Sequence, residues 1–409
     1  MWNDAVTALR FEYLGTIIKF LYGTSLLWLP IFLSIVFLNI WLKYTRAKAV
    51  IKDGGTLLEI KLPRDVFKSP LAMEIILTSL YQSGKGTYLD TFVEGKHRPW
   101  FSLEIVSIDG EVRFFIWTKT KFKQLIESQF YAQYPGVEIY EVEDYSKSFF
   151  IDPEKNGLVG LAFKLNKPDI YPIKTYIDYG LDREQEEESK VDPMTSVLEF
   201  MGSIKAGEQI WIQILIQAHR KLGMKEDAVF AKEDWKKAGE AEIKKKIAEI
   251  TGGDDEDAPR RAPTMGEKET ISALERSLTK LPFEVGVRCM YVFRKEVFDP
   301  INITGLLGSF RQYSSQNLNE IRIAKGTGLD YPWEDFMGMR KAERERKILN
   351  AYKLRSYFQA PYKHLFTKPF ILTTEELATI FHLPGKVVGT PTLTKISSRK
   401  SEAPSNLPI

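Results

Sequence analysis

The sequence is poor in the residues that build disulfide frameworks and metal sites. Its 409 residues include one cysteine, Cys289, and four histidines. One cysteine excludes an internal disulfide, and its place in an alternating apolar run favours a buried small hydrophobe over a reactive thiol. No Cys or His partner stands at metal-ligand spacing from any of the histidines, which are His97, His219, His364 and His382. We therefore predict no metal site.

A dominant charge of one sign is also lacking, because 57 Lys and Arg residues oppose 54 Asp and Glu residues, for a net charge of +3. Domains dedicated to nucleic acid usually carry a more one-sided charge. The hydrophobic fraction of 44% and the charged fraction of 27% are those of an ordinary globular protein. The length suits two or three domains. We expect a folded body with a sizeable core, and the scarcity of cysteine favours the cytosol as its compartment.

The sequence motifs of common enzyme classes are absent as well. The string nearest to a Walker A loop is SGKGT at 83–87, which lacks the leading glycine and the G-K-[ST] ending that cradle phosphates. GLLGS, from Gly305, lies in an amphipathic pattern and is better explained by helix packing. No G-x-S-x-G nucleophile elbow occurs. We therefore predict no catalytic or cofactor-binding residue, no cofactor and no enzymatic activity in this chain.

One segment has no charge at all. Residues 24–42, TSLLWLPIFLSIVFLNIWL, are nineteen positions long, which corresponds to about 28 Å of helix and matches the hydrocarbon thickness of a bilayer. Aromatic residues that favour the membrane interface lie near its ends, namely Tyr22, Trp28, Trp41 and Tyr44. A cleaved signal peptide is disfavoured because the run is too long and no small-x-small site follows. We predict a transmembrane helix within an anchor at residues 1–50.

The basic residues around this segment predict its orientation. Lys43, Arg46, Lys48 and Lys52 follow it, whereas Arg10 and Lys19 precede it. Because basic residues are retained on the cytoplasmic side, we expect a single-pass protein of the cytoplasmic (inner) membrane. The bilayer is its first partner, and the body that follows is expected to lie in the cytoplasm.

The body has the periodicity of an α+β fold. Residues 55–150 predict a strand at 58–62, a helix from Ser69-Pro70, a hairpin turning at Asp109-Gly110, a helix over 122–130 and a closing strand from Val137. This order, βαββαβ, is that of a ferredoxin-like module. We predict a first such module at 55–150.

The same order recurs over residues 151–330, which predicts a second module and an internal duplication. Its predicted elements are a strand from Gly157, a helix from Asp192-Pro193, strands from Glu208 and Phe283, a helix from Asp299-Pro300 and a short strand from Asn319. A helical insertion at about 224–281 separates the two middle strands, with a loop from Gly252 at its tip. Residues 331–409 predict a charged helix at 339–355, a capping box at Thr373–Glu376 and an extended strap after Pro384-Gly385.

The βαββαβ order is shared with RNA-recognition motifs, which stack bases on aromatics of their central strands. Phe114, Phe115 and Trp117 lie on the third strand, but the K/R-G-F/Y-G/A-F pattern is absent. Adjacent Phe114 and Phe115 must also point to opposite faces of the sheet. We expect core residues plus one surface-facing ring in preference to a base-stacking platform.

Long strings of the chain resemble a known family. They resemble the region ahead of the motor domain in conjugation-type ATPases, the type IV secretion and HerA/FtsK-class proteins of small-genome bacteria and archaea. The strings that carry the resemblance are LLEIKLPRDVFKSPLAMEIILTSLY, EGKHRPWFSLEIVSIDGEVRFFIWTK, IESQFYAQYPGVEIYEVEDY, GEQIWIQILIQ and FHLPG with SEAPSNLPI. They cover roughly residues 55–409. In that family the phosphate-binding loop follows the APSNLP strap, so no catalytic residue can be transferred to this chain.

The resemblance implies a membrane-anchored accessory or scaffold region of a translocation ATPase. Its expected partner is a P-loop ATPase, supplied in trans or by a C-terminal motor domain that this sequence does not contain. The resemblance also implies assembly into a homo-oligomer. The alternative is a free-standing membrane adaptor that binds nucleic acid or a protein through its α/β modules.

Overall fold

The computed structural model describes residues 15, 19–20, 22–62, 68–84, 87, 89–90, 93–182, 191–219, 235–251, 262–329, 331–335 and 338–384. The chain divides into two compact units. One is formed by residues 1–52 and 85–97, and the other by residues 53–84 and 98–409.

The first unit is built on one long helix. Helix α2, Ser25–Asp53, has 29 residues and contains nearly the whole predicted span. The composition of this helix changes along its length. The part up to Leu42 is apolar, and the part that begins at Lys43 is basic and continues the same helix without a break. Pro30 is accommodated inside the helix.

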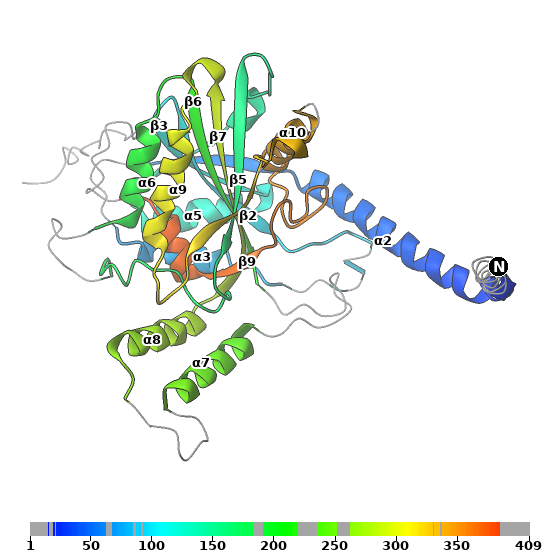
Figure 1. Cartoon of the computed structure of the whole chain (residues 1–409), viewed down its shortest axis with the longest axis horizontal. Coiled ribbons are helices and arrows are strands. Elements are labelled where there is room, and N and C mark those ends of the chain that lie inside the picture. The colour runs from blue at the N-terminus through cyan, green and yellow to red at the C-terminus, as the bar shows by residue number, and fades with distance from the viewer. Residues whose placement is uncertain are drawn as a thin grey trace, which may run out of the picture. The chain divides into compact units, whose positions relative to one another are not determined.

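The second unit is an α+β structure, as predicted for the body (Figure 1). In the residues that the structure describes, nine strands form one antiparallel sheet in the order β4-β1-β3-β2-β6-β7-β5-β8, with β9 paired to β7. The strands are β1 Thr56–Lys61, β2 Trp100–Ile108, β3 Glu111–Thr118, β4 Glu138–Val142, β5 Asn156–Leu165, β6 Glu208–Ala218, β7 Pro282–Arg294, β8 Ile321–Gly326 and β9 Phe370–Thr373.

The two halves of the sheet repeat one pattern. In the first half α3 (Leu71–Ser79) connects β1 to β2, and α5 (Lys123–Gln133) connects β3 to β4. In the second half α6 (Pro193–Gly202) lies between β5 and β6, and α9 (Ile301–Phe310) lies between β7 and β8. The halves meet where β2 pairs with β6, from Trp100↔Gln217 to Ile108↔Gln209. The continuous sheet that results was not predicted.

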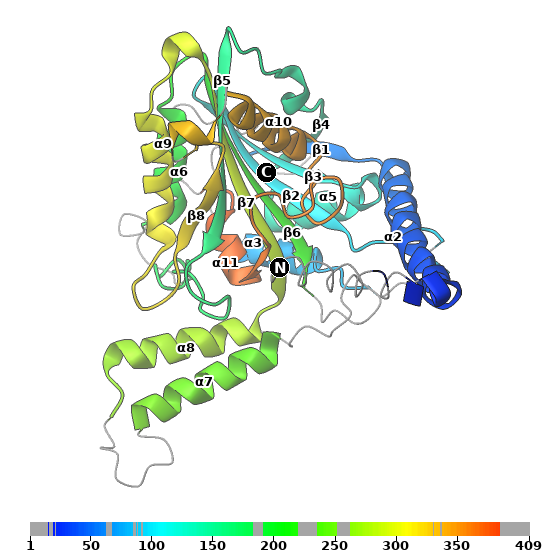
Figure 2. The ribbon, with the colours of Figure 1, turned by 45° about the vertical axis from the view of Figure 1, so that its right-hand side comes forward.

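The main core lies between the sheet and a layer of helices. Alternate strand residues such as Ile105, Phe114, Ile212 and Val287 are at most 1% exposed and pack against α3, α5, α6, α9 and α11 (Thr374–Ile380). Figure 2 shows α6 and α9 on one side of the sheet and α10 (Met339–Lys353) on the other. The predicted burial of Cys289 is confirmed, since its side chain is fully buried in this core.

The opposite face of the sheet is covered too. Phe115, Trp211 and Met290 pack there against residues of α10 such as Tyr352, and against Tyr145 and Phe149. Phe114 is 1% and Phe115 is 3% exposed, so neither of these adjacent rings faces solvent, and Trp117 is half-buried. The predicted solvent-facing ring is therefore not found at Phe114 or Phe115. The reason is the second covering layer, which the strand periodicity does not reveal.

The predicted insertion contains two helices, α7 (Trp235–Thr251) and α8 (Met265–Thr279). They lie side by side at one end of the sheet (Figure 2) and share an apolar contact around Leu274, Ile243 and Ile170. Thr264 begins α8 with a capping box to Glu267. The predicted start of the insertion at about 224 and the loop from Gly252 lie outside the described residues, as do the strap after Pro384 and Lys85-Gly86 of the SGKGT string.

Candidate functional site

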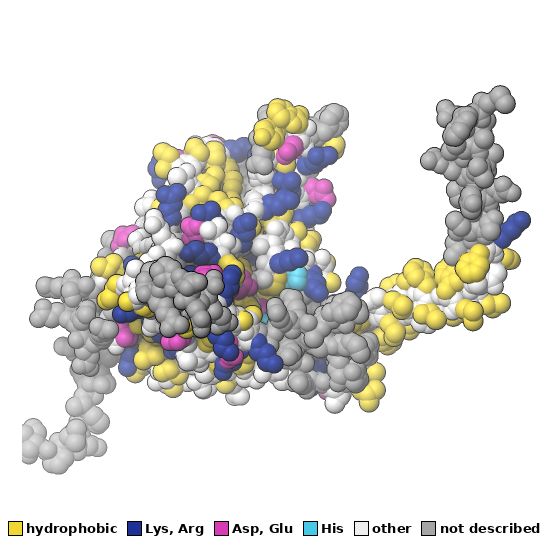
Figure 3. Space-filling model, turned by 60° about the horizontal axis from the view of Figure 1, so that its bottom comes forward, with side chains coloured by type: hydrophobic (Ala, Val, Ile, Leu, Met, Phe, Trp, Pro, Cys, Tyr) yellow, Lys and Arg dark blue, Asp and Glu magenta, His cyan; other side chains and the backbone are white. Residues whose placement is uncertain are grey.

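Helix α2 is long and apolar enough to cross a membrane. Only 6% of its most apolar stretch of 18 residues is buried, which argues against the core helix of a soluble protein. Leu26, Ile31 and Ile40 are 87%, 63% and 62% exposed, and hydrophobic side chains cover the surface of α2 seen in Figure 3. The amide of Asn39 donates to the carbonyl of Ile35 at 2.9 Å, so its cost in an apolar setting is reduced within the helix itself.

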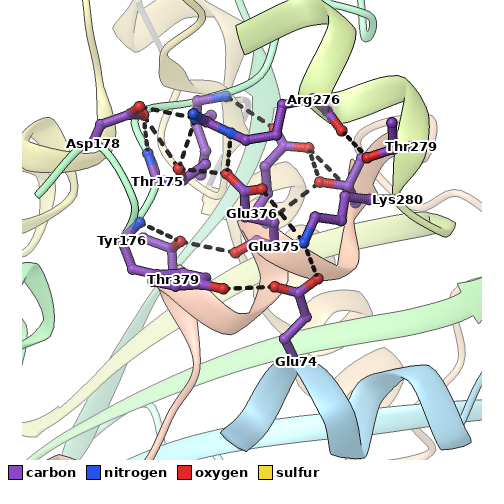
Figure 4. Close-up of polar contacts among 12 residues, drawn as sticks. Glu74, Thr175, Tyr176, Asp178, Arg276, Thr279, Lys280, Glu375, Glu376 and Thr379 are labelled. Carbon is purple, nitrogen blue, oxygen red and sulfur yellow. Dashed lines mark hydrogen bonds and ion pairs between the residues drawn. The ribbon is translucent and has the colours of Figure 1, made fainter. Parts of the chain in front are cut away.

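A cluster of ionised groups joins α8, α11 and α3 (Figure 4). Arg276 donates to Asp178 at 2.8 Å and to Glu375 at 3.0 Å. Lys280 contacts Glu74 at 2.7 Å and Glu375 at 3.8 Å. Both cations belong to the C-terminal end of α8, where positive charge is favoured by the helix dipole. We call these five residues the α8–α11 cluster.

Hydroxyl and backbone donors complete the cluster. Thr175 donates to Glu375 at 2.7 Å, and Tyr176 donates to Glu74 at 2.7 Å. The neighbouring Glu376 accepts from the backbone N–H of Thr373 at 2.8 Å, in the predicted capping box, and also from the backbone N–H of Ile173 at 2.9 Å. These contacts fix the segment 173–178 against the start of α11.

The carboxyl groups of Glu375 and Glu376 have pKa values above those of solvated carboxyl groups. Burial raises the pKa of Glu376 to about 7 although backbone donors oppose the rise. Burial also raises the pKa of Glu375, against the lowering by Thr175, Arg276 and Lys280. Glu375 is 3% exposed and Glu376 is 2% exposed, so neither presents a face to a substrate. The arrangement can hold an inserted helix on the body, and this is the role that its geometry supports.

A second polar cluster lies on the other face of the sheet. Glu104 on β2 and Arg355 after α10 form two contacts, at 3.0 and 3.1 Å, and Arg355 also binds Asp144. Gln213 on β6 donates to Glu104 at 2.7 Å and accepts from Arg288 on β7 at 2.6 Å. We call these five residues the Arg355 cluster.

Four residues of the Arg355 cluster are buried, and Asp144 is partly exposed at its edge. Burial lowers the pKa of Arg288 to about 10, whereas the pKa of Arg355 is raised because Glu104 and Asp144 outweigh the effect of its burial. Arg288 also donates to the carbonyls of Ala351 and Ser356 at 2.7 and 3.2 Å. The cluster therefore fastens residues 351–356 across three strands.

Within the second unit, the structure does not bring His219, His364 and His382 together in one metal site. His382 is buried and binds Asp192 at 3.1 Å, while His219 lies 3.3 Å from Glu284, which also binds Arg98 at 3.3 Å. His97 belongs to the first unit, and His364 has a positive φ of 53°. Within the described part of the chain, no group of three or more His, Cys, Asp or Glu residues could hold a metal ion.

Two hollows lie elsewhere in the second unit. A cavity of about 400 Å³ is lined by apolar Ile170, Trp235 and Ile371 and by polar His219, Glu242 and Glu284. A wider groove of about 1050 Å³ runs between β5 and α10, over Leu158, Phe293 and Phe298. Neither is lined by residues of the α8–α11 cluster or the Arg355 cluster.

No residue of either cluster was predicted as functional or structural from the sequence. The sequence does contain a signal for the Arg355 cluster. Its members Glu104, Gln213 and Arg288 are polar residues inside strongly apolar strands, WFSLEIVSI, EQIWIQILIQA and PFEVGVRCMYVFR. A charge in such a run must be paired or it costs several kcal/mol. Nothing in the sequence identified Arg355 as the partner.

The comparisons with known proteins give a family without a described activity. Residues 47–395 match a family described as a domain of unknown function (DUF8128). Among curated proteins no match was found. The match spans the end of α2 and every described strand of the sheet. The chain therefore belongs to the DUF8128 family.

Proposed function

We propose that this chain is the membrane-anchored scaffold region of a translocation ATPase of the type IV secretion or conjugative-transfer kind. The observation that carries the proposal is the apolar, exposed surface of α2. A helix with such a surface is stable in a bilayer and costly in water. The basic residues after Leu42 support a body that faces the cytoplasm at the inner membrane.

In this proposal the body offers surfaces on which partners dock and does not catalyse a reaction. We interpret each half of the sheet as a ferredoxin-like module, because the spatial orders β4-β1-β3-β2 and β8-β5-β7-β6 correspond strand for strand. The two modules meet at the β2–β6 pair and act as one rigid platform. Rigid elements position a partner more exactly than loops do.

The buried ionisable groups bind one another, and this supports a scaffold role without catalysis. Glu104 and Arg355 satisfy each other, and Glu375 is held by Arg276 and Thr175. A catalytic group needs a partner in the substrate and access to it. These groups fasten helices and segments to the sheet, so they suit a scaffold.

The partner class comes from the resemblance of the sequence to regions that precede P-loop motors. The α7–α8 hairpin supports it as a docking arm, because Arg276 and Lys280 hold its base on α11 and α3. Along this arm Ile247 and Met265 are 41% and 75% exposed. We propose that a P-loop ATPase is the protein that docks here, and that the chain assembles into a homo-oligomer with it.

The alternative function is a free-standing membrane adaptor. The sheet face that would stack nucleic-acid bases is covered, since Phe115 lies 5.0 Å from Tyr145 between ring centroids and Trp211 lies 5.4 Å from Tyr352. This favours a protein partner over nucleic acid for such an adaptor. Retention on single-stranded DNA or RNA that weakens steeply with salt would reverse that preference.

Flotation of membranes tests the anchor. The full chain is expected to float with vesicles and to resist alkaline extraction, whereas the double variant Leu33→Arg, Phe37→Arg is expected to be extracted. Each arginine at the centre of a span costs about 2.5–3.5 kcal/mol on insertion. Ile301→Arg, at a position 72% exposed on α9, is the matched control and should float like the unchanged chain. Extraction of the unchanged chain would disprove the anchor.

Affinity purification from detergent-solubilised membranes tests the partner. The expected result is co-purification of a P-loop ATPase, reduced by Arg276→Ala and unaffected by Ile301→Arg. Repeated recovery of the chain without an ATPase would contradict the motor proposal and leave the adaptor as the better explanation.

A further inference from the structure

We infer that the loop between α3 and β2 forms a second membrane contact, in which Leu89 and Val93 enter the headgroup region of the bilayer beside α2. The loop belongs to the same compact unit as α2, which joins residues 85–97 to residues 1–52. The described residues of the loop are 87, 89–90 and 93–97. The inference rests on the proposed membrane anchor.

The loop is fixed to α2 by a close backbone approach. Gly95 has a φ of +67°, and a Cβ atom added to it would lie 2.2 Å from the carbonyl oxygen of Thr45. Only glycine adopts this conformation at such a distance without strain. Thr45 is 5% exposed, unlike most of α2. The loop therefore covers the helix at this turn.

This turn lies at the expected boundary of the hydrocarbon. Thr45 follows Leu42, the last residue of the apolar run, by three positions, or about 4.5 Å along the helix. Each polar layer of a bilayer is about 5–7 Å deep. Trp41 and Tyr44 are the amphipathic side chains expected at that depth. The contact with Thr45 thus holds the loop at headgroup level.

Two large apolar side chains point outward from the loop. Leu89 is 72% and Val93 is 63% exposed. The amide of Val93 donates to the carbonyl of Leu89 at 2.8 Å, so the two residues are one helical turn apart and share a face. Asp90 accepts from the backbone of Thr87 at 2.9 Å, and the amide of Lys96 donates to the carbonyl of Asp90 at 2.9 Å. The loop is closed on itself while its apolar face is left outward.

Basic residues near Leu89 and Val93 favour an anionic bilayer as the surface that these side chains contact. The loop itself carries no excess of basic residues, since Asp90 and Glu94 accompany Lys96 and Lys96 lies 3.4 Å from Asp90. The basic excess comes from Lys43, Arg46 and Lys48 on the part of α2 that flanks Thr45. Basic residues next to an apolar turn are the composition of interfacial membrane segments.

Site-specific fluorescence tests the inference on the full chain. Because Cys289 is the only native cysteine and is buried, a Cys289→Ala background permits single labels at Leu89→Cys and Val93→Cys. An environment-sensitive fluorophore is attached, and the chain is reconstituted in vesicles of phosphatidylcholine and phosphatidylglycerol. Nitroxide lipids labelled near the headgroup are expected to quench both positions and to shift their emission to the blue. Phe32→Cys lies near the middle of the span, so nitroxides deep in the acyl chain are used to quench it, and it is the quenched control. Ile301→Cys on α9 is the control that neither nitroxide should quench.

The outcomes separate the loop from the anchor. Quenching at Phe32 with Leu89 and Val93 behaving like Ile301 would overturn the loop contact and leave the anchor in place. An unquenched label at Phe32 would overturn both. Quenching at Leu89 and Val93 that is lost in vesicles of phosphatidylcholine alone would support the anionic bilayer as the occupant.

Discussion

Arg355 and Glu104 form an ion pair across 251 positions of sequence, with Nε and Oε1 3.0 Å apart and side chains that are 1% and 0% exposed. One partner lies at the centre of the sheet and the other just after α10. A buried guanidinium is stable only with a full set of acceptors, and Arg355 finds them in Glu104, Asp144 and the carbonyl of Lys353. The pair is the main polar link between residues 353–358 and the sheet.

Arg355→Met should therefore destabilise the second unit strongly, by about 3–5 kcal/mol, because Glu104 would remain buried and unpaired. The measurement is denaturant unfolding of the detergent-solubilised chain. Lys347→Met removes an exposed ion pair with Glu343 and should change the free energy of unfolding by about 0–1 kcal/mol. Equal, small effects of the two substitutions would contradict the structural role of Arg355.

A second prediction concerns the base of the α7–α8 hairpin. Arg276→Ala removes charged hydrogen bonds to Asp178 and Glu375, which are worth about 1.5–3 kcal/mol. Amides of α8 should then exchange with deuterium about tenfold faster or more, because each 1.4 kcal/mol corresponds to a factor of ten. Arg276→Lys should restore part of the protection. Unchanged exchange in Arg276→Ala would show that the apolar contact around Leu274 holds the hairpin alone.

The sequence predicted the strands of the body well because their apolar residues alternate. Ile210, Ile212, Ile214 and Ile216 all lie in the main core, as the pattern indicates. The same alternation suggests a solvated opposite face, yet Trp211 is fully buried there under Tyr145 and Tyr352. The covering layer comes from distant segments, and no local pattern encodes their register.

The candidate site was less predictable than the fold. The span 24–42 is visible in the sequence because a bilayer demands a continuous apolar run. The α8–α11 cluster is not visible, because Arg276, Lys280 and Glu375 are ordinary charges on amphipathic helices until the fold brings them together. Glu376, which adjoins this cluster without belonging to it, carried a local signal as the end of its capping box.

A third prediction concerns pH. His382 is fully buried, and burial lowers its pKa, but the charge and hydrogen bond of Asp192 and the carbonyl of Ala378 raise it overall above its usual value. The pKa of Asp192 is lowered because His382 and the amide of Met194 outweigh its burial. Stability from His382 is thus fully present below pH about 6.5 and is lost as the pH rises through the raised pKa. Stability from Asp192 is present above pH about 3.9 and is lost as the pH falls through the lowered pKa.

His382→Gln should therefore lower Tm below pH about 6.5 and flatten the decline of Tm above it. Asp192→Asn keeps the hydrogen bond to Met194 that begins α6 and should flatten the same decline. The double variant should add little to either single one, because both remove the same pair. A loss of Tm in His382→Gln that is equal at every pH would exclude an ionised His382.

The packing of Tyr357 on β7 gives the last prediction. A Cβ atom added to Gly286 would lie 2.3 Å from the ring of Tyr357, which is 2% exposed and whose hydroxyl donates to the carbonyl of Thr367 at 3.1 Å. Because the ring is held at both ends, Gly286→Ala should force a shift that costs about 1–3 kcal/mol. Gly308→Ala is the matched control: it lies within α9, an added Cβ would meet no atom within 4 Å, and it should gain about 0.5–1 kcal/mol. Denaturant unfolding of the two variants in detergent distinguishes these signs, and a stabilising Gly286→Ala would mean that residues 353–369 do not pack on β7 as described.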